Sequence, residues 1–325
     1  MRHMPQIYIA SLSEAGYLSA IREGFERLGV GARLKPGDRV CIKPNLTFPT
    51  FRPGVMTNPE CLENLIIALR DYTERLTIVE SDAGGYNRFR MDDVFEKIGL
   101  NVLGKRYGVG VVNLSNQPAR NIAVASRGRQ LQVPLPCMLL DDCDFFITVP
   151  VPKVHCNTLV SLAVKNQWGC IAQPIARLEL HPDFPQVIYQ VNKALRIALV
   201  VVDGRYGLNR NGPMRGDAVE LNWLMVTDDI YAADVVCCWI MQIEPRKAPH
   251  LRYLEETCGL PSEQEILFNQ DYKKFSTHRF YLRREWTDYP GLVAFRSRVA
   301  AYWAYRSPLA GFLHRMLYLV RQPFY

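Results

Sequence analysis

The chain has 325 residues, 48% hydrophobic and 22% charged, which is the composition of an ordinary globular protein and excludes wholesale disorder. No apolar run approaches the roughly 20 residues that a membrane-spanning helix needs, and no apolar segment follows a basic start as in a secretory signal, so a cytoplasmic protein is expected. The formal net charge of +7 comes from the end of the chain, because residues 273–325 hold ten Lys or Arg and only two Asp or Glu.

Short β-branched runs alternate with amphipathic segments over most of the chain. The predicted strands are residues 6–10, 39–42, 76–79, 109–114, 122–125, 145–149 and 197–202, and the predicted helices are residues 13–28, 59–69, 92–98 and 231–241. This alternation is typical of a three-layer α/β fold with a mostly parallel, Rossmann-like sheet of about six strands, residues 122–125 lying in it or in an outlying hairpin. The alternation stops near Pro245, so we predict an α/β domain over residues 1–245 and a basic, aromatic helical region over residues 246–325.

Polar side chains stand where several of the apolar runs end. They are Lys43 and Asn45, Glu80 and Asp82, Lys153 and His155, and Asp203. In open α/β sheets, ligands bind in the crevice outside the carboxyl ends of the strands, so we expect these side chains to share one polar site. A purely structural role is an alternative for each of them: Asp82 could cap the segment that follows it, and His155 could be a packed, hydrogen-bonded core residue.

The segment from Pro150 to His155 is the most informative of these strand ends. Its two prolines restrict the loop after a buried strand, and Lys153 and His155 point the same way if the segment is extended. A histidine that titrates near neutral pH beside a lysine is suited to proton transfer or to anion binding. Asp203 is suited to orienting the histidine, neutralising a lysine or holding a divalent cation.

Further cationic and amide side chains follow this segment. They are Lys165, Asn166, Arg177, His181 and, in a glycine-containing loop, Arg215, whose guanidinium can grip a carboxylate or phosphate as a fork. We therefore predict an enzyme that acts on an anionic small molecule, a carboxylate or a phosphate. The predicted catalytic residues are Lys153, His155, Lys165 and Asp203, and the predicted substrate-binding residues are Lys43, Asn45, Asp82, Asn166, Arg177, His181 and Arg215.

The predicted reaction is proton abstraction beside a carbonyl group, as in an isomerase or a lyase, because lysines can stabilise the resulting oxyanion. Two alternatives stay open: a redox protein with a metal or iron–sulfur centre, and a non-catalytic accessory protein at a membrane surface. The nine cysteines are scattered without a C-x-x-C pair, so reduced thiols are predicted and an iron–sulfur cluster is not, whereas a divalent metal stays open.

A series of short motifs lies in order between about residues 38 and 240. They are Lys43-Pro44-Asn45, Thr57-Asn58-Pro59, Ser81-Asp82, Pro152-Lys153-x-His155, Lys165-Asn166-x-x-Gly169, Val202-Asp203-Gly204, Gly212-Pro213-x-x-Gly216-Asp217 and Asp234. This series resembles the DUF362 family, whose members are often described as uncharacterised and sometimes carry added iron–sulfur segments. The resemblance marks as the site Lys43, Asn45, Asp82, Lys153, Lys165, Asn166 and Asp203. Asn58 and Asn157 stand where many relatives have histidines, so a mechanism that needs those histidines is not expected here.

Residues 279–325 interleave arginine with aromatic and aliphatic side chains. Helical periodicity gathers the apolar residues between Leu292 and Trp303, and those between Leu309 and Val320, on one face of each segment. This composition suits helices that lie in an anionic membrane interface, peripheral on the inner face of the membrane. It equally suits a helical hairpin packed on the sheet domain or on a second subunit of a homo-oligomer. Nucleic acid is not an expected partner, because no DNA- or RNA-binding motif accompanies the charge.

Overall fold

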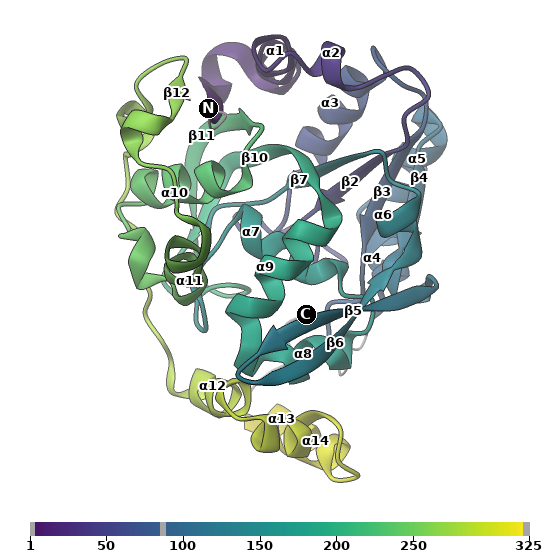
Figure 1. The fold of residues 1–325 in the computed structure, drawn as a ribbon, viewed down its shortest axis with the longest axis vertical. Coiled ribbons are helices and arrows are strands. Elements are labelled where there is room, and N and C mark those ends of the chain that lie inside the picture. The colour runs from purple at the N-terminus through teal and green to yellow at the C-terminus, as the bar shows by residue number, and fades with distance from the viewer. Residues whose placement is uncertain (1–3, 85–88, 321–325) are drawn as a thin grey trace.

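The computed structural model describes residues 4–84 and 89–320 and has an α/β fold around a large central sheet (Figure 1). The strands are β1 (Gln6–Ser11), β2 (Val40–Pro44), β3 (Leu76–Glu80), β4 (Gly110–Asn113), β5 (Ala119–Ser126), β6 (Arg129–Pro136), β7 (Phe145–Val149), β8 (Lys153–His155), β9 (Leu159–Ser161), β10 (Ile197–Asn209), β11 (Asp217–Thr227) and β12 (Leu267–Phe268). The helices are α1 (Leu12–Arg27), α2 (Val30–Arg33), α3 (Pro59–Leu69), α4 (Met91–Lys97), α5 (Leu100–Tyr107), α6 (Cys137–Asp141), α7 (Ala163–Asn166), α8 (Pro174–Leu180), α9 (Phe184–Leu195), α10 (Ile230–Ile240), α11 (Pro249–Cys258), α12 (Tyr289–Arg296), α13 (Arg298–Tyr305) and α14 (Ala310–Val320).

The central sheet of the described residues has ten strands and is mostly parallel. Eight strands follow the order β12-β1-β11-β10-β7-β2-β3-β4, while β8 pairs with β10 and β9. The pairs from β10 to β4 are parallel, whereas β11 runs antiparallel to both of its neighbours. The predicted α/β class with a mostly parallel sheet is confirmed.

Buried side chains alternate between the two faces of the parallel strands and pack against a helical layer on each side. Ile42 and Ile147 belong to the core that α1, α3, α4 and α5 cover. Cys41 and Phe146, their neighbours along the same strands, belong to the opposite core, which α7, α9 and α10 cover. A parallel sheet needs this cover on both faces, which is why its strands are apolar throughout.

The sheet is larger than the sequence predicted. The strand expected at residues 197–202 continues to Asn209 as β10, and it pairs with β11, for which no strand was predicted. The first half of β11 is polar and partly exposed, so its sequence does not have the apolar character of a buried strand. Residues 122–125 lie in the separate β5–β6 hairpin, which was one of the two predicted alternatives.

The C-terminal part of the chain has two segments that pack differently. Residues 249–280 pack against the α/β body, because Leu251, Leu254 and Phe280 belong to its core and β12 pairs with β1. Helices α12 to α14 lie together at one end of the molecule beside α8, at the bottom of Figure 1. The domain boundary near residue 245 stays a prediction, and residues 321–325 of the predicted tail lie outside the described residues. Among the described helices, none combines the length and the apolar character needed to cross a bilayer.

Candidate active site

The carboxyl ends of β2 and β3 and the segment from β8 to α8 line an open pocket of about 130 Å³. Its walls combine the ends of β2 and β3, the β8–β9 ribbon, α7 and α8. The predicted site residues that line it are Lys43, Asn45, Lys153, His155, Lys165, Asn166 and Arg177. Segments that are far apart in the sequence therefore bring cationic and amide side chains to one edge of the sheet, as ligand sites of open α/β sheets require.

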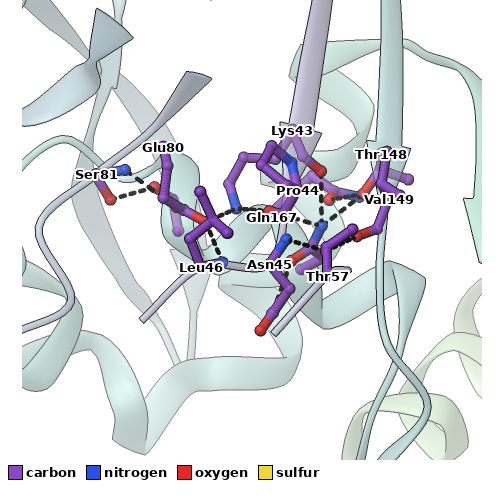
Figure 2. A network of polar contacts seen from close by, with 12 residues as sticks. Lys43, Pro44, Asn45, Leu46, Thr57, Glu80, Ser81, Thr148, Val149 and Gln167 are labelled. Carbon is purple, nitrogen blue, oxygen red and sulfur yellow. Dashed lines mark hydrogen bonds and ion pairs between the residues drawn. The ribbon is translucent and has the colours of Figure 1, made fainter. Parts of the chain in front are cut away.

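Lys43 forms a buried ion pair at the floor of this pocket. Its ammonium is 2.6 Å from a Glu80 carboxylate oxygen and also donates to the carbonyl of Pro44 (Figure 2). Glu80 also accepts from the backbone N–H groups of Leu46 and Ser81, so both charges are satisfied within the protein. A Cβ atom at Gly169 would lie 2.6 Å from Glu80 Oε1, which explains a glycine at this position.

Lys153 begins a chain of hydrogen bonds that all point in one direction. Its ammonium donates to Asn45 Oδ1 over 2.6 Å, and Asn45 Nδ2 donates to Asn166 Oδ1 over 3.0 Å. Asn166 Nδ2 then donates to the hydroxyl of Thr148 and to the carbonyl of Lys43. Each amide is oriented by its next partner, so Asn45 is held with its oxygen toward Lys153.

The same chain of hydrogen bonds continues beneath the pocket into the core. The Thr148 hydroxyl donates to Gln167 Oε1, and Gln167 Nε2 donates to Asn192 Oδ1 (Figure 2 shows the Thr148 and Gln167 part). Asn192 Nδ2 ends the chain on the carbonyls of Val164 and Ile188. Thr148 and Asn192 were not predicted from the sequence. Thr148 gave a weak signal as the single polar residue of the run 145–149, where a buried polar group needs a partner. Asn192 gave none, because Gln190 and Lys193 stand beside it in α9.

Burial, together with the charges of Lys165 and Lys43, lowers the pKa of Lys153 from 10.5 to about 7. The Lys153 nitrogen has two acceptors, Asn45 Oδ1 and the carbonyl of Val55 at 2.8 Å, and no third partner among the described residues. A neutral amine has two N–H groups and one lone pair. With both N–H groups engaged, the lone pair is left for a ligand in the pocket.

His155 is buried in the wall of the pocket as a neutral imidazole. Burial, together with the neighbouring charge of Lys165, lowers its pKa well below the usual value. The backbone N–H of Asn157 donates to His155 Nδ1 over 3.1 Å, so the proton of the neutral ring is on Nε2. In this state His155 is a hydrogen-bond donor through Nε2.

Lys165 and Arg177 supply positive charge on the other side of the pocket. Burial lowers the pKa of Lys165 to about 8, and its ammonium lies 4.6 Å from the centre of the Phe184 ring. No hydrogen-bond acceptor for this ammonium occurs in the described part of the chain. Arg177 donates to the backbone carbonyl of Asp82, and burial lowers its pKa to about 10, so it stays charged at neutral pH.

Asp203 does not line the pocket. Its carboxylate accepts hydrogen bonds from the Tyr17 hydroxyl and the Asn58 backbone N–H, both over 2.7 Å, and from the N–H of Arg205. Burial raises its pKa and these hydrogen bonds oppose the shift. Asp203 therefore ties β10 to α1 and to the start of α3.

Three other predicted residues also stand outside the pocket lining. Asp82 accepts from the Met91 backbone N–H and from Asn113, and so fixes the start of α4. The His181 ring stacks on Phe295 with 4.0 Å between ring centroids, and burial lowers its pKa to about 3. Arg215 lies 3.7 Å from Glu285 as an ion pair. No three or more His, Cys, Asp or Glu residues of the described chain group together as metal ligands would.

Comparison with known proteins gives matches over most of the chain. The sequence model of the family described as "Domain of unknown function (DUF362)" matches residues 40–239. A thylakoid-associated protein of Synechocystis sp. is 29% identical over 266 residues, which cover 78% of this chain and 79% of that protein.

Two solved structures are similar at a lower level. The lactate racemase apoprotein from Thermoanaerobacterium thermosaccharolyticum matches with a TM-score of 0.45 and 12% identity, over 75% of this chain and 58% of that chain. A protein from Thermotoga maritima matches with a TM-score of 0.36 and 14% identity, over 62% of this chain and 53% of that one. This chain thus spans little more than half the length of either solved chain.

Proposed function

The chain belongs to the DUF362 family, and we propose that it is an enzyme that binds a small carboxylate or phosphate and transfers a proton with Lys153. The observation that carries this proposal is the setting of the Lys153 nitrogen. It has two fixed acceptors, an open third position and a pKa lowered to about 7. A general base is most effective when its pKa is near the working pH, so this amine is suited to proton transfer.

The charge and volume of the pocket support a small anion as the ligand. Among the described lining residues Glu80 is the one carboxylate, and it is already paired with Lys43, so the cations Lys153, Lys165 and Arg177 have no carboxylate among these residues. The volume of about 130 Å³ is close to the cavity of about 150 Å³ that accepts a benzene ring. A ligand of roughly six to eight non-hydrogen atoms fits this space.

The proposed reaction is proton abstraction beside a carbonyl or carboxylate group. The neutral Lys153 amine removes the proton of a C–H bond, and the electron pair of that bond moves onto the carbonyl oxygen. Lys165 and Arg177 stabilise the resulting oxyanion, to which His155 can donate from Nε2. The Lys153 ammonium then returns the proton: return to the same carbon regenerates the substrate, whereas return to the far carbon of a conjugated enolate, with the electron pair moving back from the oxygen, shifts the double bond and gives an isomer without a co-reactant. Loss of a substituent from the neighbouring carbon would instead give a lyase product.

Hydrogen exchange in D₂O tests this step without knowledge of the product. Wild-type protein is incubated with a panel of small 2-hydroxy, 2-oxo and phosphorylated carboxylates, and the α-proton signals are followed by proton NMR. We expect at least one signal to disappear as deuterium enters. Lys153→Met lowers the exchange rate by about a hundredfold or more, because it removes the base at similar volume.

Lys105→Met is the matched control, because it makes the same substitution at an exposed lysine on α5. It leaves the exchange rate unchanged, and circular dichroism checks that both variants are folded. Equal exchange by the wild type and Lys153→Met would remove Lys153 from the mechanism. Sulfate binding without exchange of any compound in the panel would leave anion binding and contradict proton transfer.

We also propose a cytoplasmic location, which is supported by nine cysteines that are all free thiols. A divalent metal and the redox alternative stay predictions. Metal analysis and an absorption spectrum of protein purified without oxygen test both, since an iron–sulfur centre absorbs visible light.

A further inference from the structure

The three C-terminal helices expose an unusual number of large apolar side chains. We name this the C-terminal helical surface. It consists of Val293, Val299, Tyr302, Trp303, Leu309, Phe312, Leu313, Met316 and Leu319, each of which is exposed. Within α13 and α14 these side chains recur three or four residues apart, so they share one face of each helix. An exposed apolar face of this size marks a site that another surface covers.

The opposite side of these helices is already used to hold them on the body. Arg298 forms an ion pair of 2.6 Å with the buried Asp183, and Arg306 forms one of 2.6 Å with Glu179 of α8. Phe295 stacks on His181, next to α8. These contacts occupy one side of α12 and α13, whereas the residues of the C-terminal helical surface are exposed. The three helices lie at the lower end of the molecule (Figure 1).

The charge around the C-terminal helical surface has one sign. Between residues 289 and 320 every charged side chain is an arginine. Two of these arginines, Arg296 and Arg315, are exposed and have no carboxylate partner in the described part of the chain. Upstream, Asp288 is buried and Glu285 lies beside Arg215, so neither acid offsets this positive charge at the surface.

We propose that the C-terminal helical surface binds an anionic lipid membrane, with α13 and α14 lying in the interface. Tyrosine and tryptophan rings prefer the headgroup level, aliphatic side chains enter the acyl boundary, and arginines are attracted to anionic headgroups. A second copy of the chain is a poorer partner. A symmetric dimer through this surface would bring arginines of one copy against arginines of the other, with no acid to pair them.

Vesicle flotation with the full chain tests this inference. The probes are vesicles of phosphatidylcholine alone and of phosphatidylcholine mixed with phosphatidylglycerol. We expect the wild type to float with the anionic vesicles and to a much smaller extent with the neutral ones. The double variant Val299→Glu, Phe312→Glu lowers the bound fraction by about tenfold or more, because it removes apolar burial and adds repulsion.

Val102→Glu is the matched control, since Val102 on α5 is 62% exposed and Val299 is 69% exposed. It keeps wild-type flotation, and thermal melting shows that all variants are folded. Three results overturn the proposal: no flotation of the wild type, equal flotation with both kinds of vesicle, or equal flotation of the double variant. A dimer in light scattering that Val299→Glu dissociates would identify a second copy as the partner instead.

Discussion

The pocket and the C-terminal helical surface differ in which side chains are buried and which are exposed. In the pocket, groups that favour water are buried: Lys43 is 1% exposed and is held by Glu80, and Lys153 is held by fixed oxygens. On the C-terminal helical surface, groups that avoid water are exposed, with Val299 69% accessible. The protein itself supplies most of the partners that the buried polar groups of the pocket need. The apolar side chains of the C-terminal helical surface, in contrast, are removed from water only when another surface covers them. Substitutions should therefore be costly to stability in the pocket and nearly neutral on the surface.

The strongest test of this contrast is Glu80→Gln. It removes the negative member of a buried ion pair and leaves the Lys43 ammonium uncompensated, which costs about 3–5 kcal/mol in the free energy of unfolding. Urea denaturation measures the change. Glu63→Gln, which breaks the exposed pair with Arg106, is the control and should cost less than about 1 kcal/mol. Equal costs for the two variants would mean that the Lys43–Glu80 pair is solvated in solution.

Asp203→Asn separates a structural role of Asp203 from the predicted catalytic one. An amide N–H₂ group would face the backbone N–H of Arg205 or that of Asn58, neither of which can accept, so we expect a loss of about 1.5–3 kcal/mol in stability. Affinity for sulfate, measured by calorimetry, stays at the wild-type value because Asp203 is outside the pocket lining. A variant of normal stability that loses hydrogen exchange would restore Asp203 to the catalytic residues.

The pH dependence of the pocket follows from its two lysines with lowered pKa values. Lys153 has a pKa of about 7 and must be neutral to remove a proton, so the exchange rate rises as the pH passes 7. Lys165 has a pKa of about 8 and must be charged to bind the anion, so the rate falls as the pH passes 8. On the rising limb and on the falling limb of the pH–rate profile, the exchange rate approaches a tenfold change per pH unit, which corresponds to about 1.4 kcal/mol.

Rate profiles of the wild type and Lys165→Met measure these limbs. The variant loses the fall near pH 8, and its rise moves to higher pH because the charge of Lys165 no longer lowers the pKa of Lys153. Sulfate is the matching binding probe because its charge is constant in this range, and its affinity should decline steadily from pH 6 to pH 9. A profile that is flat between these values would show that neither lysine titrates during the reaction.

Much of the fold could be predicted from sequence because parallel strands must be apolar on both faces. Residues 145–149 and 197–202 have this character and form β7 and the first part of β10. β11 could not be predicted, because its first half lies at a partly exposed edge of the structure and carries polar side chains. Lys43 and Lys153, at two of the predicted polar strand ends, both line the pocket; that they act on a ligand stays a prediction.

Asp203 illustrates why the rest of the site was harder to predict. An aspartate followed by glycine after an apolar run has the sequence character of a strand end, but β10 continues through it to Asn209. Its carboxylate accordingly turns to Tyr17 of α1, and not to the pocket. Thr148 and Asn192 could not be predicted for a different reason. Their hydrogen-bonding role depends on partners from other elements, and no local sequence pattern indicates those partners.

The smallest predicted effect concerns the stability of the C-terminal helical surface. Val299→Glu should change the free energy of unfolding by less than about 0.5 kcal/mol, because its side chain has little packing to lose. Ala301→Glu places the same substitution two residues further along α13, where the side chain is 0% exposed, and a buried carboxylate there should cost more than about 2 kcal/mol. Urea denaturation of the two variants compares the two sides of one helix. A large loss in Val299→Glu would mean that this side is packed in the isolated protein, and the membrane proposal would then lose its exposed surface.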